Sequence, residues 1–78
     1  MLAKDLLTQV AQMPFVSKGK IVGDLTNVEL SNVTFESVDL SNIILSNCSL
    51  DSVVFIDCNL SGLDFSRVSG SRIILNNC

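Results

Sequence analysis

Large apolar residues recur at every fifth position along most of the chain. Ten of eleven such sites fit the pattern, with Gly70 as the exception: Leu25, Leu30, Phe35, Leu40, Leu45, Leu50, Phe55, Leu60, Phe65 and Leu75. A second apolar register lies two positions before each of them, and Ser, Asn, Asp and Thr fill most other positions. Neither a helical period of about 3.6 nor strict alternation gives this spacing, so each unit is predicted to be a short extended segment followed by a polar corner.

This spacing resembles that of the pentapeptide-repeat family, whose units place a small residue two positions before a central Leu or Phe. The match covers residues 23–78 without an insertion. The resemblance implies an all-β fold, a right-handed quadrilateral parallel β-helix in which four units make one coil. The chain would then form two coils and most of a third, under three coils in all. Val and Ile often replace the family's Ala or Cys at the small position, so we expect a fuller interior.

The first residues follow a helical period instead. Apolar residues lie four apart on a predicted helix of residues 2–12, and Pro14 ends it; the stripe comprises Leu2, Leu6 and Val10 beside Ala3, Leu7 and Ala11. A helix this short is marginal by itself in water. We therefore expect it to cover the open first coil around Gly23 and Leu25, as the capping units of solenoids do. A docking helix for a partner is the alternative.

Two parts of the chain are predicted from these patterns. Residues 1–22 would form the N-terminal amphipathic helix and a turn, which together act as a cap. Within this part, we predict a polar turn over Ser17–Lys20, and Ile21 would begin the first wall of the solenoid. Residues 23–78 would form the pentapeptide-repeat solenoid.

Composition and charge narrow the possible partners. Eight acidic and five basic residues give a net charge of −3, which disfavours binding to a phosphate backbone because that contact needs clustered Lys and Arg. No apolar run reaches the roughly 18 residues that span a bilayer, and the N-terminus does not resemble a cleaved signal peptide. We expect a cytoplasmic protein, although an effector secreted without a cleaved signal would look the same.

The sequence offers little catalytic chemistry. His is absent, and the carboxylates fall mostly at outward or corner positions, whereas catalysis needs a perturbed acid, base or nucleophile in a concave site. Cys58 and Cys78 would stack in one column, where a disulfide is conceivable, while Cys48 falls on the opposite wall. We expect all three cysteines to be reduced thiols in the core. We therefore predict no enzyme, no catalytic, cofactor-binding or metal-binding residue, no cofactor and no small-molecule substrate.

One face of the predicted solenoid breaks the polar pattern of outward positions. Val54, Ile56 and Ile74 would form an exposed apolar patch there, and Ile44 would add to it from a neighbouring wall. Such a patch on so small a protein favours a contact surface. The alternative is that these β-branched residues only favour strand formation.

The last coil supplies a second candidate surface. Phe65, Ile73 and Leu75 would lie near an unpaired strand edge, which proteins usually cover. This C-terminal edge predicts either a homodimer or a continuation of the chain.

These features favour a non-catalytic protein-interaction scaffold or adaptor that presents flat β-helix faces and binds a protein partner or a second copy. The family resemblance adds bacterial effectors, in which such repeats serve as interaction domains. It also implies an alternative, a DNA-mimic inhibitor of a type II topoisomerase (gyrase). Such inhibitors resemble long acidic rods, whereas this chain predicts a short stack of low charge.

Overall fold

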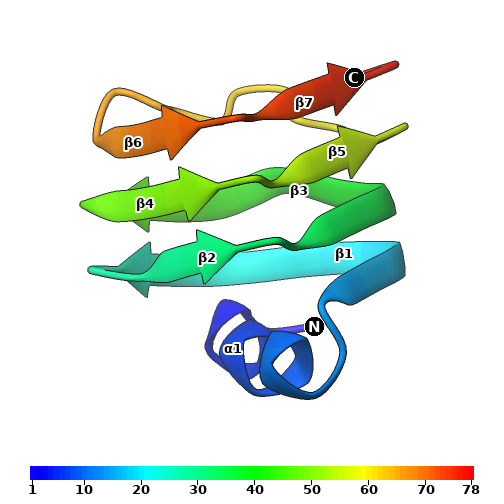
Figure 1. Ribbon diagram of the computed structural model, residues 1–78, viewed down its shortest axis with the longest axis horizontal. Helices are drawn as coiled ribbons and strands as arrows, with labels where there is room; N and C mark the ends of the chain where they lie inside the picture. Colours follow the sequence, from blue (N-terminus) through cyan, green and yellow to red (C-terminus); the bar gives the residue numbers. More distant parts are fainter.

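The computed structural model describes all residues, 1–78. Strands stack above one another in a solenoid, and a single helix lies across its lower end (Figure 1). The elements follow in chain order: α1 (Ala3–Gln12), β1 (Phe15–Thr26), β2 (Glu29–Ser31), β3 (Thr34–Ser46), β4 (Cys48–Asp51), β5 (Val54–Ile56), β6 (Val68–Ser71) and β7 (Ile74–Asn76).

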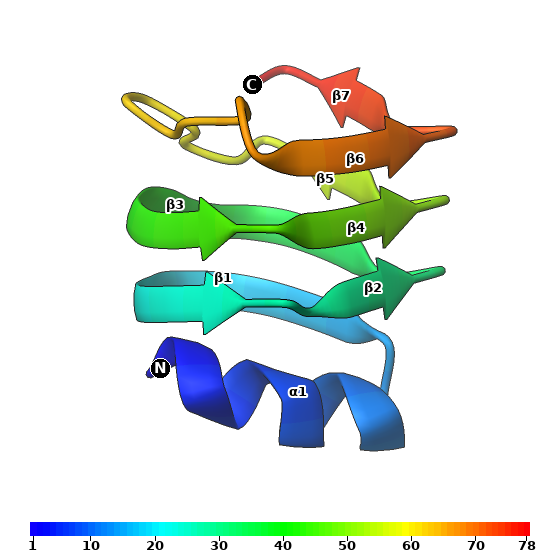
Figure 2. The same ribbon diagram turned by 90° about the vertical axis from the view of Figure 1, so that its left-hand side faces the viewer.

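All strand pairs are parallel and fall into two sheets, ordered β1-β3-β5-β7 and β2-β4-β6. The two sheets form different sides of the same coils (Figure 2). Phe35 pairs with Phe55 and Phe55 with Leu75, a step of 20 residues. Residues stacked in register in this way are called a column below, and each side of a coil a wall. The predicted fold is confirmed: a parallel β-solenoid of about three turns with one short helix.

The polar corners follow from backbone geometry. Most corners place one non-glycine residue at a φ between 52° and 58°: Lys18, Asn27, Asn32, Ser37, Asn47, Ser52, Asp57, Arg72 and Asn77. This left-handed region is costly for bulky side chains and is tolerated best by Asn and Asp. The corner N–H groups then join successive coils, as when Asn27 donates to the Ser46 carbonyl at 3.0 Å. The recurrent Asn, Ser and Asp therefore encode the turns.

The interior is entirely apolar. Sixteen buried residues form one core cluster, and no polar or charged residue is buried. The rings of Phe35 and Phe55 stack with centroids 5.2 Å apart and planes 8° from parallel. Burial of such side chains stabilises the fold by roughly 25 cal/mol for each Å² removed from water. The five-residue repeat thus places one large side chain per wall in the core.

The first coil begins earlier than the repeat predicts. Strand β1 starts at Phe15, and the predicted polar turn over Ser17–Lys20 is a corner within this strand, where Lys18 has a φ of 55°. Val16 pairs with Phe35, one residue out of step with the rest of the solenoid, and the register shifts between Lys20 and Val22. The one-residue offset buries Val16 and turns Phe15 outward, which the period of five does not anticipate. The division into a cap of residues 1–22 and a solenoid of residues 23–78 stays a prediction.

Helix α1 covers the first coil, as expected of a cap. Ala3 and Leu6 are each 1% exposed, and the Cβ of Ala3 lies 3.4 Å from the point where a Cβ on Gly23 would stand. The Met1 ammonium donates to the Lys20 carbonyl at 2.8 Å. The buried face is narrower than the predicted stripe, because Leu2 and Leu7 remain 48% and 39% exposed.

The third coil is incomplete on one wall. Residues 60–67 form turns instead of a strand, although pairing resumes at Val68 in the expected register. Leu25 pairs with Leu45, but the next residue predicted for this core column, Phe65, is 42% exposed and pairs with nothing. The prediction that Phe65 completes the column is wrong, and the physical reason lies in local hydrogen bonds of the loop described below.

Candidate interaction surfaces

One outward column runs up the wall that holds Phe35 and Phe55. Strand pairing stacks Phe15, Thr34, Val54 and Ile74 in register, one residue from each coil. These four residues are called the apolar stripe below. Because β-strand side chains alternate between faces, each stripe residue points outward while its neighbour points into the core.

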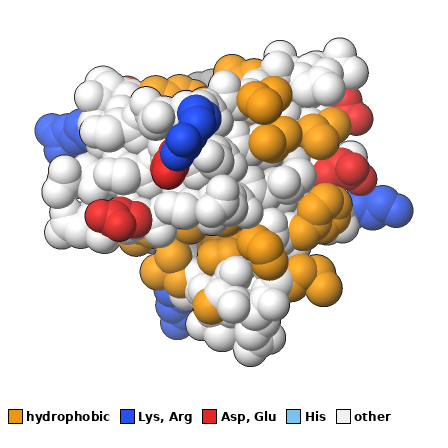
Figure 3. All heavy atoms as spheres, in the orientation of Figure 1, with side chains coloured by type: hydrophobic (Ala, Val, Ile, Leu, Met, Phe, Trp, Pro, Cys, Tyr) orange, Lys and Arg blue, Asp and Glu red, His pale blue; other side chains and the backbone are white.

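The stripe is open to solvent at both ends. Phe15 and Ile74 are 39% and 55% exposed, and Thr34 and Val54 between them are half-buried. Hydrophobic side chains gather over β5 and β7 at the right of Figure 3. The sequence pattern placed Val54 and Ile74 on this face but missed Phe15, because its outward position depends on the shifted register of β1.

The other predicted patch residues divide between two walls. Ile56 follows Phe55 on β5 and is half-buried beside the stripe. Ile44 is 59% exposed but pairs with Asp24, and it lines a groove with Gly62, Asp64 and Arg67. Ten residues separate Ile44 from Val54, which is half of a 20-residue coil. The prediction that Ile44 joins the patch from a neighbouring wall is therefore wrong: it lies on the opposite wall.

Charged residues flank the stripe. At one corner Arg72 donates from Nη2 and Nε to Asp51 Oδ1, at 2.7 and 3.2 Å. Both side chains are largely exposed, so this pair contributes at most about 1 kcal/mol to stability. On the other side lie Glu36, which pairs with Ile56, and the corner residue Asp57. The wall thus presents a narrow apolar strip between polar borders.

The open end of the solenoid forms the second surface. Strands β6 and β7 pair with a neighbour on one side only, at the end opposite α1 (Figure 1). Leu75 stacks on Phe55 in the core column yet is 57% exposed. It shares a groove of about 380 Å³ with Phe65, Leu60, Cys58 and Cys78. Ile73, the third predicted edge residue, is half-buried against the core instead.

The comparison with known proteins agrees with this architecture. Residues 35–69 match the family model described as pentapeptide repeats (8 copies). This part of the chain consists of pentapeptide repeats. No curated protein and no solved structure matches the chain. The family therefore accounts for the fold without indicating a partner.

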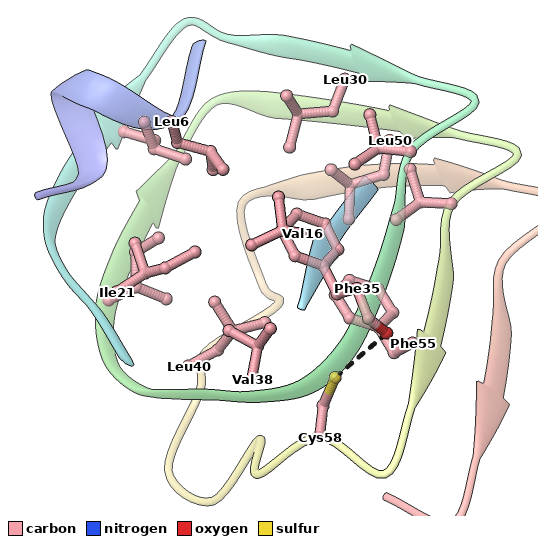
Figure 4. Close-up of a cluster of buried hydrophobic side chains, with 14 of the residues drawn as sticks. Leu6, Val16, Ile21, Leu30, Phe35, Val38, Leu40, Leu50, Phe55 and Cys58 are labelled. Atoms are coloured by element: carbon pink, nitrogen blue, oxygen red, sulfur yellow. Dashed lines mark hydrogen bonds between the residues drawn. The ribbon is translucent and has the colours of Figure 1, made fainter. Parts of the chain in front are cut away.

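The interior of this pentapeptide-repeat solenoid is packed with side chains, which point inward from every wall (Figure 4). Three thiols follow the repeat: Cys48, Cys58 and Cys78 donate to the carbonyls of Leu25, Phe35 and Phe55, at 3.2, 3.4 and 3.5 Å. All three are free, and burial raises the pKa of the Cys58 thiol. A thiol held protonated in this way is a core group rather than a nucleophile.

Two carboxylates of the repeat, Asp39 and Asp64, are engaged in local turns. Asp39 Oδ1 accepts from the Ser41 hydroxyl at 2.6 Å and from the Ser41 N–H at 2.9 Å, and these bonds hold the pKa of Asp39 below its usual value. No group of three His, Cys, Asp or Glu residues converges to hold a metal ion. The single helix, ten residues long, does not meet the length needed to cross a membrane. The geometry thus offers surfaces for contact.

Proposed function

We propose that this protein is a non-catalytic protein-interaction scaffold and that two copies associate through the open end of the solenoid. The observation that carries the proposal is the exposure of Leu75. It occupies the core column of Phe35 and Phe55 but remains 57% exposed. A core side chain in this position is stabilised when a second apolar surface covers it.

The geometry of the open end suits a two-fold contact. Its strands offer unpaired backbone groups, and the groove beside them is lined mostly by apolar side chains. In a two-fold dimer the same patch serves both copies. The apolar stripe then remains free on the side wall, where a partner protein can bind between the charged borders.

Light scattering at high protein concentration tests the association. We expect the wild type to be dimeric and Leu75→Asp to be monomeric, because an unpaired carboxylate in the contact is costly to bury. The matched control, Val54→Lys with Ile74→Lys, changes only the stripe and should remain dimeric. If all three proteins are monomeric, the association is wrong. If only the lysine variant dissociates, the stripe is the contact.

A DNA-mimic inhibitor of a type II topoisomerase is less compatible with the shape. The chain measures 25 × 24 × 22 Å along its principal axes, so it is a block rather than a rod. One of its acidic side chains, Asp51, is paired with Arg72. A supercoiling assay with a gyrase distinguishes the two functions, since a scaffold leaves the enzyme's activity unchanged.

A further inference from the structure

The interrupted wall of the third coil leaves a strand edge open inside the solenoid. Residues Ile43–Ser46 of β3 pair below with Gly23–Thr26 of β1. Above them no strand follows, because the pairing of β3 with β5 ends at Glu36 and only the bridge Asp39–Asn59 continues it. This segment is thus paired on one side only.

Comparison with the coil below identifies the hydrogen bonds that are missing at this edge. Asn27 donates its N–H to the Ser46 carbonyl at 3.0 Å. One coil higher, the equivalent bond would join the Asn47 N–H to the Ser66 carbonyl, and it is not formed. The next backbone bond along this edge is the one from the Cys48 N–H to the Arg67 carbonyl, at 3.2 Å.

Other groups of the same edge are also unpaired. On the opposite wall, the Val33 carbonyl accepts a hydrogen bond from the Val54 N–H of the coil above, at 3.0 Å. The Ile43 carbonyl is the equivalent group half a coil later, and no N–H of the coil above donates to it. Because a parallel ladder alternates its bonding direction, the N–H and carbonyl of Leu45 face this edge too. Together with the Asn47 N–H, the edge presents two donors and two acceptors in the spacing of a β-strand.

The loop above this edge forms hydrogen bonds within itself. The Ser66 N–H donates to Asp64 Oδ1 at 2.8 Å, and the Leu63 N–H donates to the Leu60 carbonyl at 3.1 Å. The Asp64 bond thus satisfies locally the Ser66 N–H, which would otherwise pair with β3, and the Leu63 bond forms the turn that precedes it. The space between is a groove of about 370 Å³, lined by Ile43–Ser46 on one side and by loop residues including Asp64 and Arg67 on the other.

We propose that this edge, from Ile43 to Asn47, binds an extended peptide segment of a partner protein by strand addition. Backbone donors and acceptors in strand spacing are recognised by another extended backbone. The bridge at Asn59 and the bond between Cys48 and Arg67 close the two ends of the gap, which limits the added strand to about four or five residues.

A second folded copy does not fit this site. The unpaired edges of a second copy, β6 and β7, are parts of its own folded coils, whereas the edge from Ile43 to Asn47 lies between two ordered parts of the third coil. A single extended segment can enter. Its inward side chain would lie above Leu45, which is only half-buried because Phe65 does not cover it. We therefore expect a preference for an apolar residue at the centre of the peptide. The site lies on the wall opposite the apolar stripe, and the loop of residues 60–67 separates it from the groove of the open end.

Amide hydrogen exchange on the free protein is the first test. The Asn47 N–H should exchange at least about tenfold faster than the Asn27 N–H, because only the latter has a backbone acceptor. Both are corner asparagines with nearly the same φ, 54° and 57°, so they form a matched pair. Equal protection of the two would mean that the loop closes over the edge in solution, and the proposal would be overturned.

Peptide titration followed by amide NMR shifts is the second test. The probe is an acetylated, amidated peptide with the sequence of residues 23–27, which already pairs with β3 on its other edge. At millimolar peptide we expect the Leu45 and Asn47 amides to shift and their exchange to slow. The control peptide is methylated on alternate backbone nitrogens, so that it keeps its side chains but cannot complete a strand ladder.

Each outcome decides the proposal. Shifts with the probe and none with the methylated peptide support strand addition. Equal shifts with both peptides, or no shift with either, overturn it. Leu75→Asp, which alters only the open end, should bind the probe as the wild type does, so this test is separate from that of self-association. Ile74→Lys on the apolar stripe should also leave the titration unchanged.

Discussion

Residues 39–47 and residues 59–67 carry the same apolar pattern but adopt different structures. The first stretch runs through β3 as a continuous strand, and the second, one coil later, forms a loop. Both begin with the same turn, in which the N–H of Ser41 donates to Asp39 Oδ1 and the N–H of Ser61 donates to Asn59 Oδ1. The inward residues of the repeat therefore do not decide between them.

The outward and corner residues differ. Ile44 is replaced one coil later by Asp64, so a β-branched residue that favours strands gives way to one that bonds its own backbone in turns. Asn47 takes the left-handed corner at φ 54°, whereas Arg67 at the equivalent corner does not have a positive φ. The inward residues alone therefore do not close a coil, although Asp24 in β1 and Arg72 at a corner show that one unfavourable residue is tolerated elsewhere.

Replacement of the two phenylalanines gives the largest expected contrast. Phe55→Ala should lower the free energy of unfolding by about 3–5 kcal/mol, because its buried ring leaves a cavity beside Phe35. Phe65→Ala should cost about 1 kcal/mol or less, since the ring is already 42% exposed. Urea titration of both variants measures the difference. Equal losses would show that the loop packs its phenylalanine into the core.

Substituting residues of the second coil into the loop of the third should restore the missing strand. The triple variant Gly62→Asn, Asp64→Ile and Arg67→Asn gives residues 60–67 the corner and outward side chains of residues 40–47. We expect a gain of about 1–2 kcal/mol in the free energy of unfolding, as compatible turn and strand residues commonly provide.

Hydrogen exchange provides the check on this triple variant. The Leu45 and Asn47 amides should become protected, and the probe peptide should no longer shift them. If stability falls and these amides still exchange quickly, features other than the three side chains hold the loop open.

Lowering the pH should weaken the turn between Asp64 and Ser66, a smaller and more local effect than those of the substitutions above. The backbone N–H of Ser66 holds the pKa of Asp64 below its usual value, with Arg67 contributing. Because the folded pKa is lowered, this turn stabilises the loop above the usual carboxyl range and weakens as pH falls through the lowered pKa. An NMR titration should show the Ser66 amide shifting at that low midpoint. The Ser41 amide beside Asp39 serves as the comparison, and an ordinary midpoint for Asp64 would contradict the role of the turn.

Much of the fold was predictable from the sequence, because each repeat favours its own local structure. An apolar residue every fifth position predicts one core side chain per wall, and the stacking of Phe55 between Phe35 and Leu75 confirms this. The amphipathic period ahead of Pro14 likewise predicts the capping helix. These are local patterns that repeat, so each unit supports the same interpretation.

The candidate surfaces were predictable only in part. Val54 and Ile74 could be placed side by side because they lie one full coil of 20 residues apart, and the loop of residues 60–67 adds or removes no residue from that count. Phe15 could not, because its outward position follows from the register shift between Lys20 and Val22. That shift depends on how the chain leaves α1 and enters β1, which involves contacts distant in the sequence.

The sequence by itself determined the repeat, its apolar core and its polar corners, because a period of five with alternating burial is satisfied by one kind of coil. Only the tertiary structure decided where that coil begins and where it fails. Val16 is buried in place of Phe15 because the helix and the first strand must both meet the same open coil. Residues 60–67 leave the wall where the Asp64 side chain bonds the Ser66 N–H in place of strand pairing, and the apolar pattern cannot distinguish these two arrangements.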